Sequence, residues 1–147
     1  MRTRALFFVL LAVAALSASS AALASSLAAR PTLTAGLSAY GRVLFDGRGF
    51  VVYAFTRDPR GKSVCTGACA KAWPPYVVKT RLRAAGGVKA RLLGTTRRAD
   101  GSLQVTYAGH ALYYYVGDRS KGQILCHNVT EFGGVWHVVR PDGRLVH

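Results

Sequence analysis

One stretch decides the fold: Tyr53-Ala54-Phe55-Thr56-Arg57-Asp58. Its pattern of tyrosine, aromatic residue and aspartate returns sixty positions later as Tyr113-Tyr114-Tyr115-Val116-Gly117-Asp118. The agreement extends outward on both sides, pairing Gly41 with Gly101, Gly49 with Gly109, Cys65 with Cys126 and Trp73 with Trp136, the last two after short insertions. Agreement over this length indicates that the chain contains two copies of one unit.

Each copy has the pattern of a β-hairpin. In the first, the apolar residues 43–45 and 50–55 flank Asp46-Gly47, a dipeptide typical of tight hairpin turns because glycine adopts positive φ easily. In the second, Leu103, Val105 and Tyr107 alternate with polar residues, which predicts a strand with one buried face.

The predicted fold is mainly β. Two tandem hairpin-based repeats, residues 41–78 and 101–139, pack as one small β-sandwich or barrel-like domain, because a single hairpin cannot bury its apolar face alone. A short helical turn is predicted near residues 66–73, and Pro74-Pro75 ends it because proline lacks the N–H that a helix needs.

The first residues have the pattern of a secretory signal peptide. Arg2 and Arg4 precede an apolar segment, and Ala22-Leu23-Ala24 resembles a cleavage site, so residues 1–24 are predicted to be removed and residues 25–40 to form a flexible tether. We therefore expect a secreted or extracytoplasmic envelope protein with no transmembrane segment after cleavage. No cysteine lies near the cleavage site, so no lipid anchor is expected.

The chain is strongly basic. Its formal net charge of +14 falls to +12 when Arg2 and Arg4 are removed, which favours anionic envelope polymers or a membrane surface as partners, although a GC-rich coding sequence has the same composition. The linker at residues 79–98 is the predicted polyanion contact, through Arg81, Arg83, Lys89, Arg91, Arg97 and Arg98. It lacks interleaved aromatic residues, so no specific binding of nucleic acid is expected.

The repeated motif has two interpretations. In the structural one, Tyr53, Phe55, Tyr113 and Tyr115 fill the core with Trp73 and Trp136, while Asp58 and Asp118 accept hydrogen bonds from loop N–H groups or tyrosine hydroxyls. In the functional one, the same aromatic side chains form an exposed platform for a sugar or an extended ligand. The structural interpretation is favoured because buried polar groups normally pair with one another.

The three cysteines could form a disulfide, a redox pair or a metal site. Cys65 and Cys69 lie four residues apart, within reach of a disulfide at the start of a helical turn, and a bridge is the usual state in an exported protein. Cys126 is then left as an unassigned thiol, although a bridge from Cys126 to either of the others stays open. A redox pair, or a metal site that adds His127, is the alternative function.

No enzyme is predicted. The chain has six acidic residues and none of the nucleophile or phosphate-binding motifs, so we assign no catalytic residue, no metal ligand and no cofactor. The leading expectation is a non-enzymatic binding or structural module with affinity for anionic surfaces. The oligomeric state does not follow from the sequence.

The two motifs, together with Ser63 to Pro75 after the first and Phe132-Gly133-Gly134-Val135-Trp136 after the second, resemble a bacterial family of secreted repeats. Its members are labelled predicted lipoproteins with a repeated Tyr-x-aromatic-x-x-Asp motif, and their function is unknown. The resemblance covers residues 41–139. The chain departs from this pattern because it has no lipid-attachment cysteine and because it carries Cys126.

Overall fold

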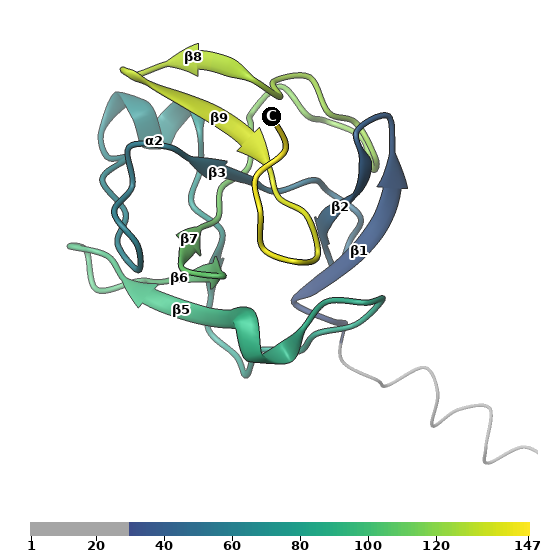
Figure 1. The fold of residues 1–147 in the computed structure, drawn as a ribbon. Helices are drawn as coiled ribbons and strands as arrows, with labels where there is room; N and C mark the ends of the chain where they lie inside the picture. The colour runs from purple at the N-terminus through teal and green to yellow at the C-terminus, as the bar shows by residue number, and fades with distance from the viewer. Residues whose placement is uncertain (1–29) are drawn as a thin grey trace, which may run out of the picture.

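The computed structural model describes residues 30–147. The predicted signal peptide, residues 1–24, and the predicted tether as far as residue 29 lie outside this part of the chain. Within it, the fold is mainly β, as predicted, with strands in three sheets and a single short α-helix among the described residues (Figure 1).

The first sheet is the antiparallel hairpin of β1 (Leu33–Ser38) and β2 (Gly41–Asp46). Residues 33–38 were expected to belong to the flexible tether, and they form a strand instead. The reason is burial, since the Leu33 side chain is fully enclosed and Ala35 is buried against the same core.

The turn predicted at Asp46-Gly47 is present. The Asp46 N–H donates to the Phe50 carbonyl at 2.8 Å, and Phe45 pairs with Val51 across the turn. The chain then enters β3 (Tyr53–Phe55), which pairs with β9 (Gly134–Val138) and not with β2. β8 (Val129–Glu131) completes this second sheet on the far side of β9.

The third sheet is built around β6 (Leu103–Tyr107), which pairs with β4 (Val77–Val78), β5 (Leu93–Arg97) and β7 (His110–Ala111). A 3-10 turn, η2 (Ala90–Leu92), leads into β5. Part of the predicted basic linker is therefore a strand, because residues 93–97 pair along the length of β6. Figure 1 shows this sheet on the opposite side of the domain from the β8–β9 hairpin.

The duplication begins earlier than the motifs indicated. β1 pairs with β2 as β5 pairs with β6, with a register that differs by one residue: Leu33 lies opposite Asp46, whereas Gly94 lies opposite Thr106, sixty positions after Asp46. The repeating unit thus starts near residues 33 and 93, whereas 41 and 101 were expected.

The two copies differ after their motifs. The first has helix α2 (Ala68–Ala72), inside the predicted helical turn, and the Cys65–Cys69 disulfide holds its start. The second has the β8–β9 hairpin in the corresponding part of the sequence. Despite this difference, the segment after each motif ends beside a motif tyrosine. Pro75, after α2, pairs with Tyr113, and Val138, in β9, pairs with Tyr53.

The two copies meet at Tyr53 and Tyr113. Each tyrosine donates its backbone N–H to the carbonyl of the other at 2.9 Å. This reciprocal pair places the two motifs side by side in opposite directions, as an approximate two-fold axis between the copies requires. It also brings their side chains into one shared core.

Candidate functional site

The tyrosine and aspartate of each motif bond across the two copies. The Tyr53 hydroxyl donates to Asp118 Oδ2 at 2.6 Å, and the Tyr113 hydroxyl donates to Asp58 Oδ2 at 2.7 Å. The second oxygen of each carboxylate accepts a loop N–H, from Val64 at 2.8 Å for Asp58 and from Leu125 at 2.9 Å for Asp118. The two tyrosines and two aspartates of the repeated motif thus satisfy one another's hydrogen-bonding groups, and the aspartates also hold the loop that follows each motif.

The environment of these groups shifts their pKa values upward. Burial raises the pKa of Asp58 and of Asp118, although their tyrosine hydrogen bonds oppose the shift. Burial, followed by the bond to the partner aspartate, also raises the pKa of Tyr53 and Tyr113, so both hydroxyls stay protonated donors. A network of this kind, in which each buried polar group has a partner, stabilises the fold.

The aromatic side chains of the motif are core residues. Tyr53, Tyr113, Trp73 and Trp136 are fully enclosed, and Phe55 is buried with them. The two indoles stack at 3.9 Å between ring centroids with planes 2° apart, and Phe55 stacks on the far face of Trp136 at 4.2 Å. Tyr115, which is half-buried, lies against Trp73 at 4.8 Å. This packing leaves no exposed aromatic platform at these positions.

The stacked tryptophans have different polar environments. The Trp73 Nε1–H donates to Glu131 Oε2 at 2.7 Å, whereas Trp136 Nε1 has no hydrogen-bond partner among residues 30–147. Glu131 lies on β8, the hairpin strand that only the second copy has. The sequence did not single out Glu131, and its relation to Trp73 follows from the fold alone.

Cys65 and Cys69 have the pairing that their short separation indicated. Cys65 and Cys69 form a disulfide with their Cα atoms 5.3 Å apart, and both are buried against the aromatic core. Cys126 is a free, half-buried thiol in the described chain. Burial raises its pKa, so it remains a thiol at neutral pH and lacks the lowered pKa of a reactive cysteine.

Three histidines line up beside the end of β9. His137 is buried, and its ring lies 5.7 Å from His127 and 4.9 Å from His147 between centroids. Burial, followed by the neighbouring imidazoles, lowers the pKa of His137. No group of three or more His, Cys, Asp or Glu side chains in the described part of the chain has an arrangement that could hold a metal ion.

The six cationic residues predicted as the polyanion contact lie on the surface, except Arg98, which is half-buried. Arg81, Arg83, Lys89, Arg91 and Arg97 are exposed. Arg98 is half-buried and joins the two copies, because its guanidinium donates to Ser63 Oγ at 2.6 Å, Gln104 Oε1 at 2.7 Å and the Cys65 carbonyl at 2.8 Å. Arg98 is therefore held inside the protein, unlike the other five.

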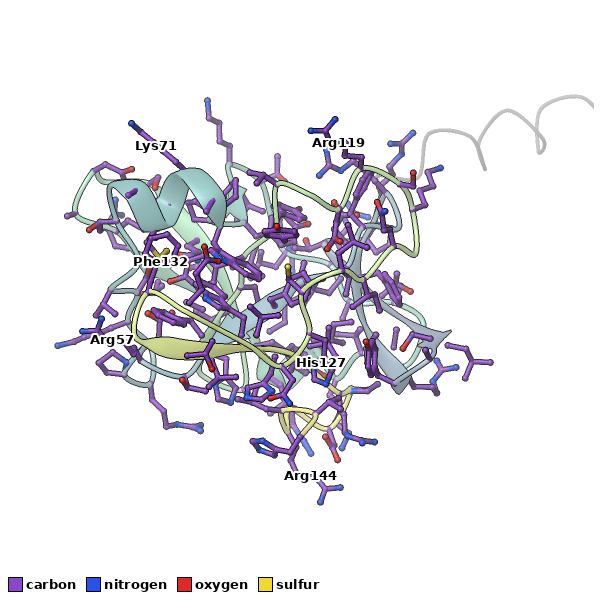
Figure 2. All side chains as sticks on the ribbon, turned by 90° about the horizontal axis from the view of Figure 1, so that it is seen from above. Arg57, Lys71, Arg119, His127, Phe132 and Arg144 are labelled. Atoms are coloured by element: carbon purple, nitrogen blue, oxygen red, sulfur yellow. A yellow bond between two sulfur atoms is a disulfide. The ribbon has the colours of Figure 1, made fainter. Side chains whose placement is uncertain are left out.

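The backbone of this segment is held in place. The Arg83 carbonyl accepts the Thr32 N–H at 2.7 Å, the Ala85 N–H donates to the Leu33 carbonyl at 3.0 Å, and Arg42 reaches the Gly86 carbonyl at 3.0 Å. The segment is therefore anchored beside β1 at residues 83–86, whereas Arg97 lies at the end of β5, which pairs with β6. Figure 2 shows that other cationic side chains, including Arg57, Lys71, Arg119 and Arg144, also point outward around the domain.

One polar cluster, at the turn after β2, was not predicted from the sequence. Asp46 was interpreted only as a turn residue, yet its buried carboxylate forms an ion pair of 2.7 Å with Arg48 and accepts the Tyr114 hydroxyl at 3.0 Å. The available signal was a departure from the repeat, because the positions sixty residues from Asp46 and Arg48 carry Thr106 and Ala108.

These features define a class of protein, a duplicated β unit whose repeated motif forms a closed core network. The family described as "secreted repeat of unknown function" matches residues 35–76 and 94–140, and the chain belongs to this family. The two matched segments coincide with the two structural copies. No curated protein and no solved structure shows significant similarity to the chain.

Residues 30–147 contain no helix that is long and apolar enough to cross a membrane.

Proposed function

We propose that this secreted repeat protein is a non-enzymatic binding module that attaches to anionic polymers of the cell envelope. The observation that carries the proposal is the lack of internal charge compensation. Of the Lys and Arg residues in the described chain, only Arg48 and Arg144 form an ion pair with an acidic side chain. Asp58 and Asp118 bond tyrosines, and Glu131 bonds Trp73.

The strip formed by the exposed residues Arg81, Arg83, Lys89, Arg91 and Arg97 is the proposed contact surface. Its backbone is anchored at residues 83–86 to β1 and to the Arg42 side chain, and at residues 93–97 to β6, so little conformational entropy of the main chain is lost when a polymer binds. Exposed cations on a fixed backbone attract a flexible polyanion through its charge, without recognition of a sequence.

The test compares two variants of equal net charge. The first replaces the five strip residues with Gln, and the second replaces Arg60, Lys62, Lys71, Arg119 and Lys121, which are exposed elsewhere on the domain. Binding to long-chain polyphosphate is measured by titration calorimetry at several salt concentrations. The wild-type affinity is expected to fall steeply with salt because exposed charges are screened.

The strip variant is expected to lose most of the binding, and the second variant only a small part. Equal losses in the two variants would show that net charge alone drives binding. A wild-type affinity for polyphosphate that does not change with salt concentration, or no binding at all, would overturn the proposed function.

A thiol-redox or metal-binding role was the alternative. No contact in the described chain favours it, since the Cys65–Cys69 disulfide is buried and Cys126 is a half-buried thiol with a raised pKa.

A further inference from the structure

The turn after β2 presents an arginine that is fixed in place. The Asp46 side chain is buried, and its carboxylate accepts the backbone N–H groups of Arg48 at 2.8 Å and Phe50 at 3.0 Å, together with Arg48 Nε at 2.7 Å. Burial alone would raise the pKa of Asp46, but these hydrogen bonds lower it, so the carboxylate is ionised at neutral pH. Asp46 thus orients the Arg48 guanidinium from one edge.

The rest of the Arg48 side chain is available to a ligand. Although Asp46 holds it through Nε, 56% of the side chain remains exposed. Its guanidinium carbon lies 5.3 Å from the Phe50 ring centroid and 5.6 Å from that of Tyr114, so two aromatic rings also support it. A guanidinium held on one edge can donate two parallel hydrogen bonds to a carboxylate or phosphate from the other.

Arg48 and Tyr114 form a shared wall between two hollows. One, of about 420 Å³, is also lined by Arg30, Thr80 and Tyr76. The other, of about 250 Å³, is also lined by Phe50 and Tyr115. The Tyr76 and Tyr114 rings lie 5.0 Å apart at 47° to each other, and the Tyr76 hydroxyl is held by the Thr32 carbonyl at 2.7 Å. Fixed aromatic rings beside a cation are a suitable surface for a sugar ring that carries an acidic group.

The second copy shows that the fold does not need this arrangement. The positions equivalent to Asp46, Arg48, Phe50 and Tyr114 carry Thr106, Ala108, His110 and Ala54. The strands at both places form normally, with β6 in the second copy where β2 lies in the first. The charged and aromatic groups are therefore an addition in one copy: Asp46 also holds the turn through the Arg48 and Phe50 N–H groups, but the exposed Arg48 guanidinium has no such role.

We propose that the groove around Arg48 binds one acidic sugar unit of an envelope polymer. The unit's carboxylate bonds the outer edge of the Arg48 guanidinium, and its ring lies against Tyr76 and Tyr114. The Asp46 charge is compensated by Arg48, and Arg30 at the groove adds a further positive charge. This inference rests on the proposed affinity for anionic polymers and assigns it a recognition site distinct from the strip of residues 81–97.

The test uses three probes on the full mature protein: a short oligogalacturonate, an uncharged oligosaccharide of the same length, and polyphosphate. The wild type is expected to bind the oligogalacturonate at least tenfold more tightly than the uncharged oligosaccharide. Arg48→Lys keeps the charge but removes the fork of donors, so it should weaken oligogalacturonate binding about tenfold. It should leave polyphosphate binding by the strip unchanged, and it should lower the melting temperature only slightly, because lysine keeps a positive charge beside the buried Asp46 but loses the Nε bond.

Arg119→Lys, at an exposed arginine outside the groove, is the matched control and should leave binding of every probe unchanged. Equal affinity of the wild type for the charged and uncharged oligosaccharides would overturn the acidic-sugar site. So would unchanged oligogalacturonate binding in Arg48→Lys. In either case polyphosphate binding by the wild type would still support the proposed function, whereas its absence would reject that function separately.

Discussion

Trp73 and Trp136 stack face to face at 3.9 Å at the centre of the domain, although they come from different copies of the repeat. The pair fills the space between the copies, and the two indoles are fully enclosed. Only Trp73 has a polar partner in the described chain, through Nε1 and Glu131. The local stability of this centre therefore depends on one carboxylate from β8.

The bond between Trp73 and Glu131 can be tested by substitution. Glu131→Ala leaves the buried Trp73 N–H without its acceptor and should lower the free energy of unfolding by about 1–3 kcal/mol. Glu131→Gln keeps an oxygen at this position and should cost less. Urea denaturation followed by tryptophan fluorescence measures both, and equal losses would contradict the assigned hydrogen bond.

The crossed tyrosine–aspartate bonds make a specific prediction about coupling. Tyr53→Phe should destabilise the protein by about 1–3 kcal/mol, because Asp118 loses a donor inside the structure. A double-mutant cycle of Tyr53→Phe with Asp118→Ala, which removes the acceptor, should give a coupling energy of at least about 0.5 kcal/mol. The matched cycle with Asp58→Ala, the aspartate of its own motif, should give a value near zero. The reverse result would mean that each tyrosine bonds within its own copy.

The cysteine assignment predicts one reactive thiol per denatured chain. Titration in denaturant without reductant should detect Cys126 alone, and Cys126→Ala should abolish the signal. Replacing both Cys65 and Cys69 with Ala should lower the free energy of unfolding by about 2 kcal/mol, since the bridge closes a short loop. Three titrated thiols, or none, would show that the pairing is wrong.

The histidines beside β9 predict a loss of stability in mild acid. Burial holds the folded-state pKa of His137 below its usual value near 6.5, so below that pH the unfolded chain binds protons more readily than the folded one. The contribution of His137 to stability is therefore complete above about pH 6.5 and is lost as the pH falls through the lowered folded-state pKa. Urea midpoints measured from pH 7.5 to 5.5 should decrease, and the decrease should be smaller in His137→Phe. Identical pH profiles in the two proteins would contradict this role.

The sequence predicted those parts of the fold that depend on local chemistry. The Asp46-Gly47 turn, the helical turn at residues 66–73 and the Cys65–Cys69 bridge each follow from neighbouring residues, and all three are present. The duplication was also predicted, because a shift of sixty positions aligns glycines, aromatic residues and tryptophans.

The parts that were missed depend on contacts between distant residues. β1 was interpreted as part of a tether because Leu33–Ser38 is small and weakly patterned, and only its place against Leu44 and Val52 makes it a strand. The pairing of Tyr53 with Asp118 is set by how the copies dock, which the motif does not encode. Arg48 was overlooked because a charged residue after Asp-Gly is ordinary in a turn, and Tyr114 reaches it only in the folded chain.

The crossed bonds from Tyr53 to Asp118 and from Tyr113 to Asp58 also indicate how such a chain can arise. A polypeptide with a single copy would have a tyrosine and an aspartate that do not pair with each other, and a second identical chain would supply both missing partners. Reciprocal contacts of this kind are those of a two-fold symmetric homodimer. The present architecture therefore places the contacts of a two-fold symmetric dimer within one chain, although the two halves are not identical, since one carries α2 and the other the β8–β9 hairpin.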